Sequence, residues 1–165
     1  MPISDYLRAL RQKIGHDRVM MPAVSAIVVN DAGHVLLHRS RDDGNWYVIG
    51  GAIDPGEEPA RAAVRETFEE TGLVVRPLRL VGVYADPVAR YANGDEVLYT
   101  AITFLCRPID GTLRVADDES LEVRYFPPDA LPATLPPTHR LKIEHALEAE
   151  RRAYYSWDET WLKNL

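Results

Sequence analysis

The sequence predicts a mixed α/β fold, a single domain in which one central helix lies between β-strands. Three observations lead to this prediction. Apolar, β-rich runs separated by turn signals precede residue 50, apolar residues recur with helical spacing over Pro59–Thr71, and strand-like runs return afterwards. The chain has 165 residues, of which 46% are apolar and 27% charged, and this is the size and composition of one ordinary globular domain.

The N-terminal part begins with an expected helix over residues 4–14, where four apolar side chains share one face. This helix belongs to an N-terminal extension, residues 1–20. Strands are expected next at residues 23–29, 34–38 and 46–49. The first two should form a hairpin, because the turn-forming residues from Asn30 to Gly33 separate them.

The central helix should begin at Pro59, which suits a first helical turn, and stop before Gly72, which suits a left-handed C-cap. Further strands are expected at residues 73–84, 96–106 and 122–126, with turns at 93–94 and 108–111. A proline-rich connection, residues 127–137, then leads to a helix over residues 138–152 that Thr138 should cap.

The C-terminal tail carries three aromatic residues, Tyr154, Trp157 and Trp161, that would share a face if the tail were helical. Exposed aromatic residues at such spacing often mark a packing or oligomer contact. We expect the C-terminal region, residues 138–165, to dock on the same domain. A homodimer interface and a lid over the substrate are the alternatives.

Charge and cysteine content narrow the classes of function. The net charge of -6 argues against nucleic-acid binding, which depends on clustered Lys and Arg, but an anionic nucleotide can bind through a metal ion. Cys106 is the single cysteine, so no internal disulfide forms, and it should be a small buried hydrophobe. No apolar run approaches the roughly 20 residues of a membrane span and no secretory signal is visible, so we expect a cytoplasmic protein without a membrane partner.

Acidic residues on the central helix carry the chemistry. An advance of about 100° per residue places Glu66, Glu69 and Glu70 together on one side. Like charges at this spacing repel one another, and a hard divalent cation, Mg²⁺ or Mn²⁺, is a natural reason to keep them. Glu57 precedes the helix and Arg65 lies beside the acidic face, where a bidentate pair could hold a glutamate. The expected core face of this helix is made by Ala60, Val64, Thr67, Phe68 and Thr71.

The spacing around these glutamates is highly specific. From Gly50 to Leu73 the chain reads GGAIDPGEEPARAAVRETFEETGL. This segment resembles the Nudix box and matches it at every charged and glycine position. Two residues depart from the family pattern: Thr67 stands where an aliphatic or small apolar residue is usual, and Ile49 replaces a proline found in many relatives. The matching positions are Gly51, Glu57, Arg65, Glu66, Glu69, Glu70 and Gly72.

Resemblance to Nudix hydrolases implies an α/β/α sandwich around a mixed β-sheet over roughly residues 22–131, with added N-terminal and C-terminal helices. It also implies that water attacks a phosphorus of a nucleoside diphosphate derivative with the help of Mg²⁺ or Mn²⁺. Glu66, Glu69 and Arg65 would belong to the catalytic set, and the proton acceptor would be Glu69 or Glu119, in an acidic loop. The implied metal ligands are Glu57, Glu66, Glu69, Glu70 and the carbonyl of Gly51.

The substrate is less sharply indicated. ADP-ribose or a nucleotide sugar is favoured, with a nucleoside triphosphate or a dinucleoside polyphosphate as the alternative. Arg39 and Arg41 are candidate phosphate contacts, and Tyr84 could line a base pocket. Trp46 could stack on a base or support the sheet. A silent nucleotide-sensing domain and an interaction protein are the other classes, and the complete set of glutamates argues against both.

Overall fold

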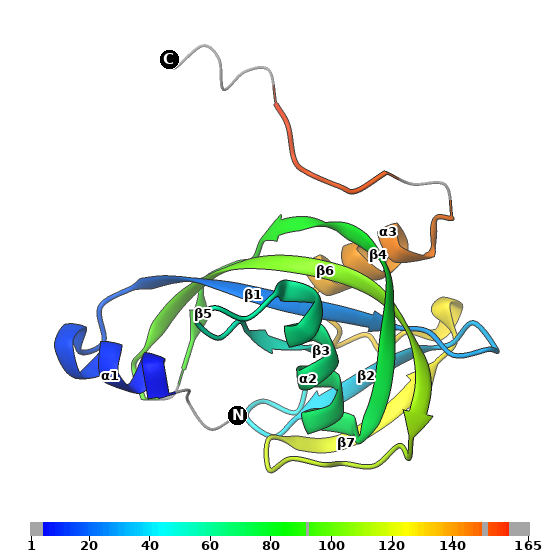
Figure 1. The fold of residues 1–165 in the computed structure, drawn as a ribbon, viewed down its shortest axis with the longest axis horizontal. Helices are drawn as coiled ribbons and strands as arrows, with labels where there is room; N and C mark the ends of the chain where they lie inside the picture. Colours follow the sequence, from blue (N-terminus) through cyan, green and yellow to red (C-terminus); the bar gives the residue numbers. More distant parts are fainter. Residues whose placement is uncertain (1–4, 92, 150–151, 159–165) are drawn as a thin grey trace.

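The computed structural model describes residues 5–91, 93–149 and 152–158 (Figure 1). Within these residues no helix combines the length and apolar character needed to cross a membrane. In chain order the elements are α1 (Asp5–Ile14), β1 (Val19–Val28), β2 (Val35–Ser40), β3 (Trp46–Ala52), α2 (Pro59–Thr71), β4 (Leu73–Ala85), β5 (Ala89–Arg90), β6 (Glu96–Gly111), β7 (Ser120–Phe126), a 3-10 turn (Pro128–Ala130) and α3 (Pro137–Leu147).

One mixed sheet forms the centre of the molecule. Its strands lie in the order β4-β6-β1-β3-β2-β7, with β5 beside β6. β1 and β6 run parallel, and the other neighbouring pairs run antiparallel. Residues 49–52 of β3 pair with β1, and residues 46–48 pair with β2. β3 thus joins β1 on one side to β2 on the other. The segment that follows β3 therefore leaves from the middle of the fold.

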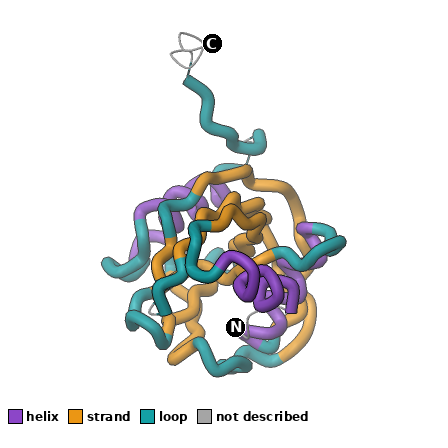
Figure 2. Tube along the Cα trace, turned by 90° about the vertical axis from the view of Figure 1, so that its left-hand side faces the viewer, coloured by secondary structure: helices purple, strands orange, loops and turns teal. Residues whose placement is uncertain are grey.

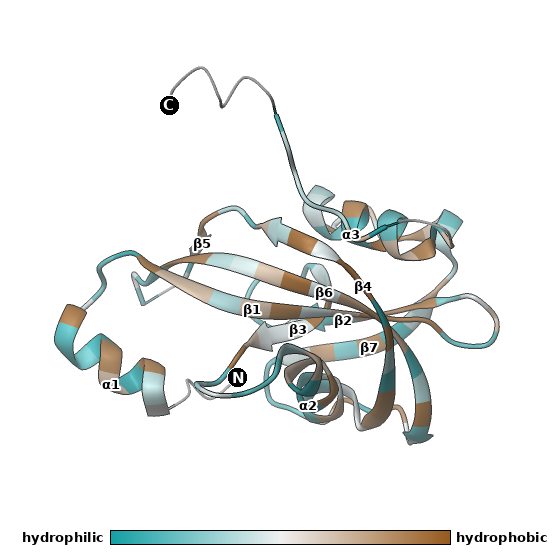
Figure 3. Ribbon diagram, turned by 45° about the horizontal axis from the view of Figure 1, so that its top comes forward, coloured by the Kyte–Doolittle hydropathy of each residue, from teal (hydrophilic) through white to brown (hydrophobic). Residues whose placement is uncertain are grey.

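Helices α2 and α3 cover opposite faces of this sheet (Figure 3). Strand side chains alternate between the two faces, so neighbouring residues enter different cores. Ala26 and Leu36 belong to the core beneath α2. Ile27 and Leu37 belong to the core beneath α3. The expected α/β/α sandwich with a mixed sheet is therefore confirmed.

Helix α2 begins and ends where the sequence predicts, but its buried face differs. Pro59 lies in its first turn, and Gly72 ends it with a φ of 71° and an N–H that donates to the carbonyl of Phe68. Ala62 and Ala63 are fully buried, whereas Phe68, an expected core residue, is 49% exposed. Thr67 and Thr71 are fully buried as expected, so the buried face keeps part of the predicted one and extends toward Ala62 and Ala63. Two charged side chains are consequently buried, Glu66 and Glu70.

The hairpin expected between residues 23–29 and 34–38 is wrong, because β3 lies between β1 and β2 and only an isolated bridge from Val29 to Val35 joins them. Two predicted boundaries are also wrong. Residues 108–111, expected as a turn, continue β6 and pair with the start of β4. The register shifts near Pro108, whose missing N–H explains an irregularity in the ladder. The predicted helix 138–152 ends at Leu147, and it begins one residue before Thr138, which is therefore not its N-cap. Pro136 holds the N-cap position without a side-chain hydrogen bond.

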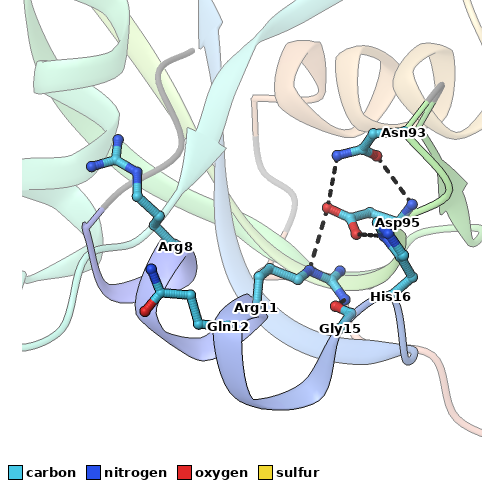
Figure 4. A pocket seen from close by; sticks show the side chains of 7 residues that line it. All are labelled: Arg8, Arg11, Gln12, Gly15, His16, Asn93 and Asp95. Carbon is cyan, nitrogen blue, oxygen red and sulfur yellow. Dashed lines mark hydrogen bonds and ion pairs between the residues drawn. The ribbon is translucent and has the colours of Figure 1, made fainter.

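Polar contacts hold the N-terminal helix α1 on the loop before β6. Nε of Arg11 lies 3.4 Å from Oδ2 of Asp95, and Nδ1 of His16 lies 2.7 Å from Oδ1 of the same carboxylate. Asn93 completes the cluster with a 3.1 Å bond to Asp95 (Figure 4). A cavity of about 330 Å³ lies beside these residues. It is lined by residues of α1 and of this loop rather than by the glutamates of the Nudix-like segment.

The C-terminal tail leaves α3 as a loop whose first part returns to the sheet (Figure 2). Tyr154 forms a parallel bridge to Gly82 in β4, and its ring stacks on Tyr84 with 5.0 Å between ring centroids. The Tyr154 amide donates to the carbonyl of Val81 at 2.8 Å. Tyr154 therefore docks on its own chain, in extended rather than helical form. Trp157 is 58% exposed, and Trp161 lies outside the described residues.

Gly82 makes this docking possible, because a Cβ there would lie 2.6 Å from the carbonyl oxygen of Tyr154. We expect Gly82→Ala to displace the tail and to speed tryptic cleavage after Arg152, measured by mass spectrometry over time. Tyr155→Ala is the control, since this side chain is 75% exposed. Equal cleavage rates in Gly82→Ala and the wild type would show that the tail is not held by this contact.

Candidate functional site

The glutamates meet where β3 passes into α2. Gly50 lies so close to β1 that a Cβ would collide with the carbonyl oxygen of Val24, and a side chain is therefore not tolerated there. The Gly50 amide donates to Oε1 of Glu70 at 3.2 Å. Gly51, the next residue, pairs with Val24 in the sheet. The close approach of two strands thus places a backbone donor against a helix carboxylate.

Arg65 joins three of the four glutamates. Its Nε and Nη2 donate to the two carboxylate oxygens of Glu57 at 2.9 and 2.8 Å. Its Nη1 donates to Glu66 at 2.8 Å and to Glu69 at 3.1 Å. Nη2 also donates to the carbonyl of Ala52 at the end of β3. The hydrogen bonds from Arg65 hold the pKa of Glu57 below its usual range, so this carboxylate is charged at neutral pH.

Two of the glutamates are buried with incomplete hydrogen bonding. Glu66 is fully buried and Glu70 is 5% exposed, and Oε2 of each has no hydrogen-bond partner among the described residues. Burial raises the pKa of Glu66 to about 7, against the opposing charge of Arg65. Burial also raises the pKa of Glu70 well above its usual value, and the charge of Glu66 adds to this. Neighbouring carboxylates of this kind are costly unless something positive compensates them.

A histidine stands on the other side of Glu70. Nδ1 of His38 lies 3.7 Å from Oε2 of Glu70 and 3.1 Å from the hydroxyl oxygen of Ser120. Burial lowers the pKa of His38 to about 4, so the ring is neutral at physiological pH. Asp117 adds negative charge near both His38 and Glu70. None of these three neighbours, His38, Ser120 and Asp117, was predicted as a site residue.

The donor set fits a hard divalent cation. Its atoms are carboxylate and carbonyl oxygens, and the unpartnered oxygens of Glu66 and Glu70 are the kind of buried acceptor that a cation satisfies. No three acidic, histidine or cysteine side chains among the described residues form a ready-made cage. The guanidinium of Arg65 instead bonds to the carboxylates of Glu57, Glu66 and Glu69. Mg²⁺ needs only one or two carboxylates, since water and substrate phosphates complete its shell.

The other charged candidates lie at the end of β2 and on the loops that follow β2 and precede β7. Glu119 has an exposed side chain, and its carbonyl accepts the N–H of Arg41 at 2.7 Å. Nε of Arg41 donates to the carbonyl of Asp118 at 2.8 Å, so this guanidinium fastens the acidic loop. Arg39 is exposed and donates to the carbonyl of Gly44 at 2.9 Å. The structure therefore engages both arginines with loop carbonyls.

The structure buries both aromatic candidates. Trp46 is 7% exposed and packs edge-on against Phe126 with 4.8 Å between ring centroids, so it supports the sheet. Tyr84 is 6% exposed and lies on the α3 side, with its hydroxyl 2.8 Å from Nδ1 of His145. The ring of Trp46 fills the core, which confirms the alternative that it supports the sheet, and the ring of Tyr84 stacks under Tyr154.

Of the missed residues, only His38 could have been indicated by the sequence, through its strand partner Tyr47. Side chains alternate along a strand, so once Trp46 enters the core its neighbour Tyr47 must face the other way. Tyr47 pairs with His38 across β2 and β3, and their ring centroids are 6.0 Å apart. The link to Ser120 depends on the pairing of β7 with β2, which no local pattern reveals.

The NUDIX domain family model matches residues 19–147. The chain is 32% identical over 117 residues to a "Putative 8-oxo-dGTP diphosphatase" of Bacillus subtilis, covering 71% of this chain and 73% of that protein. It is 34% identical over 112 residues to an "ADP-ribose pyrophosphatase" of Methanocaldococcus jannaschii, covering 67% and 63%. A MutT NUDIX hydrolase from Burkholderia pseudomallei superimposes with a TM-score of 0.66 at 28% identity, covering 77% of this chain and 98% of that structure.

The chain thus belongs to the Nudix family, as the spacing of its glutamates predicts. It is a hydrolase that acts on pyrophosphate bonds. Nudix hydrolases generally use divalent metal ions and act on small nucleotide substrates.

The raised pKa of Glu66 predicts how metal-free stability depends on pH. The folded protein retains a proton on Glu66 up to about pH 7, whereas the unfolded chain releases it near 4.5. Because the folded state binds more protons in this window, the free energy of unfolding should fall as pH rises through it. The loss from Glu66 should be on the order of 3 kcal/mol and complete above the folded pKa.

Urea unfolding in the presence of a chelator from pH 5 to pH 8 measures this slope. Glu66→Gln should make it shallower, since an amide carries no titrating proton, and Glu70, whose pKa is also raised, should account for part of the remaining slope. An identical fall in stability in Glu66→Gln and the wild type would show that Glu66 does not carry this proton linkage.

Removing Arg65 should leave the carboxylate of Glu66 buried without compensation. We expect Arg65→Ala at pH 8 to lower the free energy of unfolding by about 3 kcal/mol, as in other broken buried pairs. In a chain of this length the melting temperature should fall by about 6–12 °C. The double variant Arg65→Ala, Glu66→Gln should recover most of this loss, and a double variant no more stable than Arg65→Ala alone would contradict the account.

Proposed function

We propose that this Nudix hydrolase cleaves the pyrophosphate bond of a nucleoside diphosphate joined to a second group, with ADP-ribose or a nucleotide sugar as the favoured substrate. The observation that carries the proposal is the pair of buried, incompletely bonded carboxylates, Glu66 and Glu70, beside Arg65. Such a cluster is suited to a cation bound to phosphates. The relative named ADP-ribose pyrophosphatase supports the favoured substrate.

Glu66, Glu69 and Glu70, with Glu57 and the carbonyl of Gly51, would hold Mg²⁺ or Mn²⁺. When bound, a divalent cation neutralises phosphate charge and lowers the pKa of coordinated water.

The protein's own groups have positioning and proton-transfer roles in this proposal. Arg65 orients the carboxylates of Glu57 and Glu66 through the bonds described above. Glu69, 48% exposed beside Arg65, or Glu119 on the acidic loop accepts the proton of the attacking water. Arg39 and Arg41 border the same region on the strand end and loop, and each must leave a loop carbonyl before it can bind phosphate.

A nucleoside triphosphate or a dinucleoside polyphosphate is the second candidate substrate. It is supported by the relative named putative 8-oxo-dGTP diphosphatase, which matches with similar identity and coverage. The two candidates differ in what lies beyond the pyrophosphate. The chain's residues around the carboxylates serve either substrate, so the substrate itself must be tested.

The proposal is tested with a panel of ADP-ribose, nucleotide sugars, dinucleoside polyphosphates and nucleoside triphosphates, each with Mg²⁺ and with Mn²⁺. We expect one strong substrate, favoured among the nucleoside diphosphate derivatives, and loss of most turnover in Glu70→Gln. The melting temperature of Glu70→Gln should stay near or above that of the wild type, because one buried charge is removed. Product formation from no member of the panel with either metal would contradict the proposal.

A separate pair of variants identifies the proton acceptor. If the base lies on the loop, Glu119→Gln should lower kcat by about 100-fold or more. If Glu119→Gln keeps the wild-type kcat, the acceptor lies within the helix and Glu69→Gln should carry the loss. Near-wild-type kcat in both variants would exclude both candidates.

A further inference from the structure

The carboxylate of Glu70 is fixed on only one side by a hydrogen bond. Oε1 accepts the amide N–H of Gly50, but Oε2 has no hydrogen-bond partner among the described residues. A carboxylate held through one oxygen can still rotate about its terminal torsion, which has a broad minimum. Nδ1 of His38 lies 3.7 Å from Oε2. This is too long for a hydrogen bond but close enough to restrict where the carboxylate can turn.

The ring of His38 is itself held in place. Its Nδ1 lies 3.1 Å from the hydroxyl oxygen of Ser120, which is fully buried in β7. Tyr47, its partner across β2 and β3, stands beside the ring. The side chain of His38 is 16% exposed, so it has little freedom to leave this position. The position of the imidazole is therefore set by its contacts with neighbouring strands.

The loop before β7 links these residues back to Glu70. The amide of Ser120 donates to Oδ1 of Asp117 at 2.9 Å, which fixes the start of β7. The amide of Ala116 donates to the carbonyl of Glu70 at 3.1 Å. The same loop therefore holds the main chain of Glu70 directly, and reaches its carboxylate through Ser120 and His38.

We propose that His38 and Ser120 are positioning residues that hold the carboxylate of Glu70 in the orientation that binds a divalent cation. The inference rests on the proposed function, since it assigns Glu70 to the metal. Partners that orient a ligand without touching the metal commonly change its affinity about 10-fold to 100-fold when they are removed. His38 thereby links β2 and β7 to a cluster otherwise built from β3 and α2.

The competing view is that His38 is only a well-packed core residue. In that case its replacement lowers thermal stability and leaves metal affinity unchanged. The two views separate only if metal binding is measured directly, without substrate and well below the melting temperature. Mn²⁺ is the probe, and calorimetry gives its dissociation constant for each folded variant.

The variants are chosen to separate shape from hydrogen bonding. His38→Leu keeps much of the side-chain volume but removes the polar atom, and it should weaken Mn²⁺ binding about 10-fold to 100-fold. His38→Asn restores a side-chain N–H near the position of Nδ1 and should recover much of the affinity. Ser120→Ala frees the ring and should give a smaller loss. His34→Leu, directly before the start of β2, is the matched control and should bind as the wild type does.

Each outcome has a distinct meaning. Wild-type affinity in both His38→Leu and Ser120→Ala, measured on folded protein, would overturn the positioning role. Equal losses in His38→Leu and His38→Asn would overturn the assignment of the effect to the polar atom at Nδ1. Absence of Mn²⁺ binding by the wild type would overturn the proposed function itself, whatever the variants do.

Discussion

The site depends on burying negative charge around a single guanidinium. Arg65 makes hydrogen bonds to three glutamates, one of which, Glu66, has no contact with solvent. Such an arrangement is costly, and a fold that only needed stability would replace the carboxylates with apolar side chains. In the proposed function a divalent cation would supply the missing positive charge and would bind the oxygens of Glu66 and Glu70 that are unpartnered among the described residues. The buried carboxylates therefore account both for the proposed cation binding and for the instability of the metal-free cluster.

The rest of the fold positions these charged side chains. β3 joins both parts of the sheet, and the close approach of Gly50 to β1 sets the donor that meets Glu70. Helix α2, which ends at Gly72, holds Glu66, Glu69 and Glu70 at fixed helical spacing. The loop before β7 closes the cluster from the far side through backbone contacts to the end of α2. Strand, helix and loop each fix a different side of the cluster.

The sequence predicted what is local. The spacing from Gly51 to Gly72 sets relations within one loop and one helix, so the grouping of the glutamates follows from chain geometry alone. The fold class followed from the alternation of strand and helix patterns. Burial could not be obtained in the same way. Trp46 and Tyr84 were candidates for substrate contact because of their chemistry, but their burial on the α3 side of the sheet depends on how distant segments pack.

The residues that sequence reasoning missed are non-local. His38 and Ser120 meet across 82 positions of chain, and only the register of β2 against β7 brings them together. The buried face of α2 was misjudged for a related reason. A helical wheel gives the relative directions of side chains but not which direction meets the sheet, and here Ala62 and Ala63 meet it. Glu66 and Glu70, expected on the opposite side, are then buried together with the expected core residues Thr67 and Thr71.

The central claim is that the buried carboxylates of α2 form a cation site, and a crystal soaked in Mn²⁺ tests it most directly. The anomalous signal of Mn²⁺ locates the ion without reference to activity. The account predicts a peak at bonding distance from carboxylate oxygens of Glu66 and Glu70, with Arg65 displaced from at least one glutamate. Crystals that show Mn²⁺ only elsewhere, with Arg65 still bonded to Glu57, Glu66 and Glu69, would contradict it.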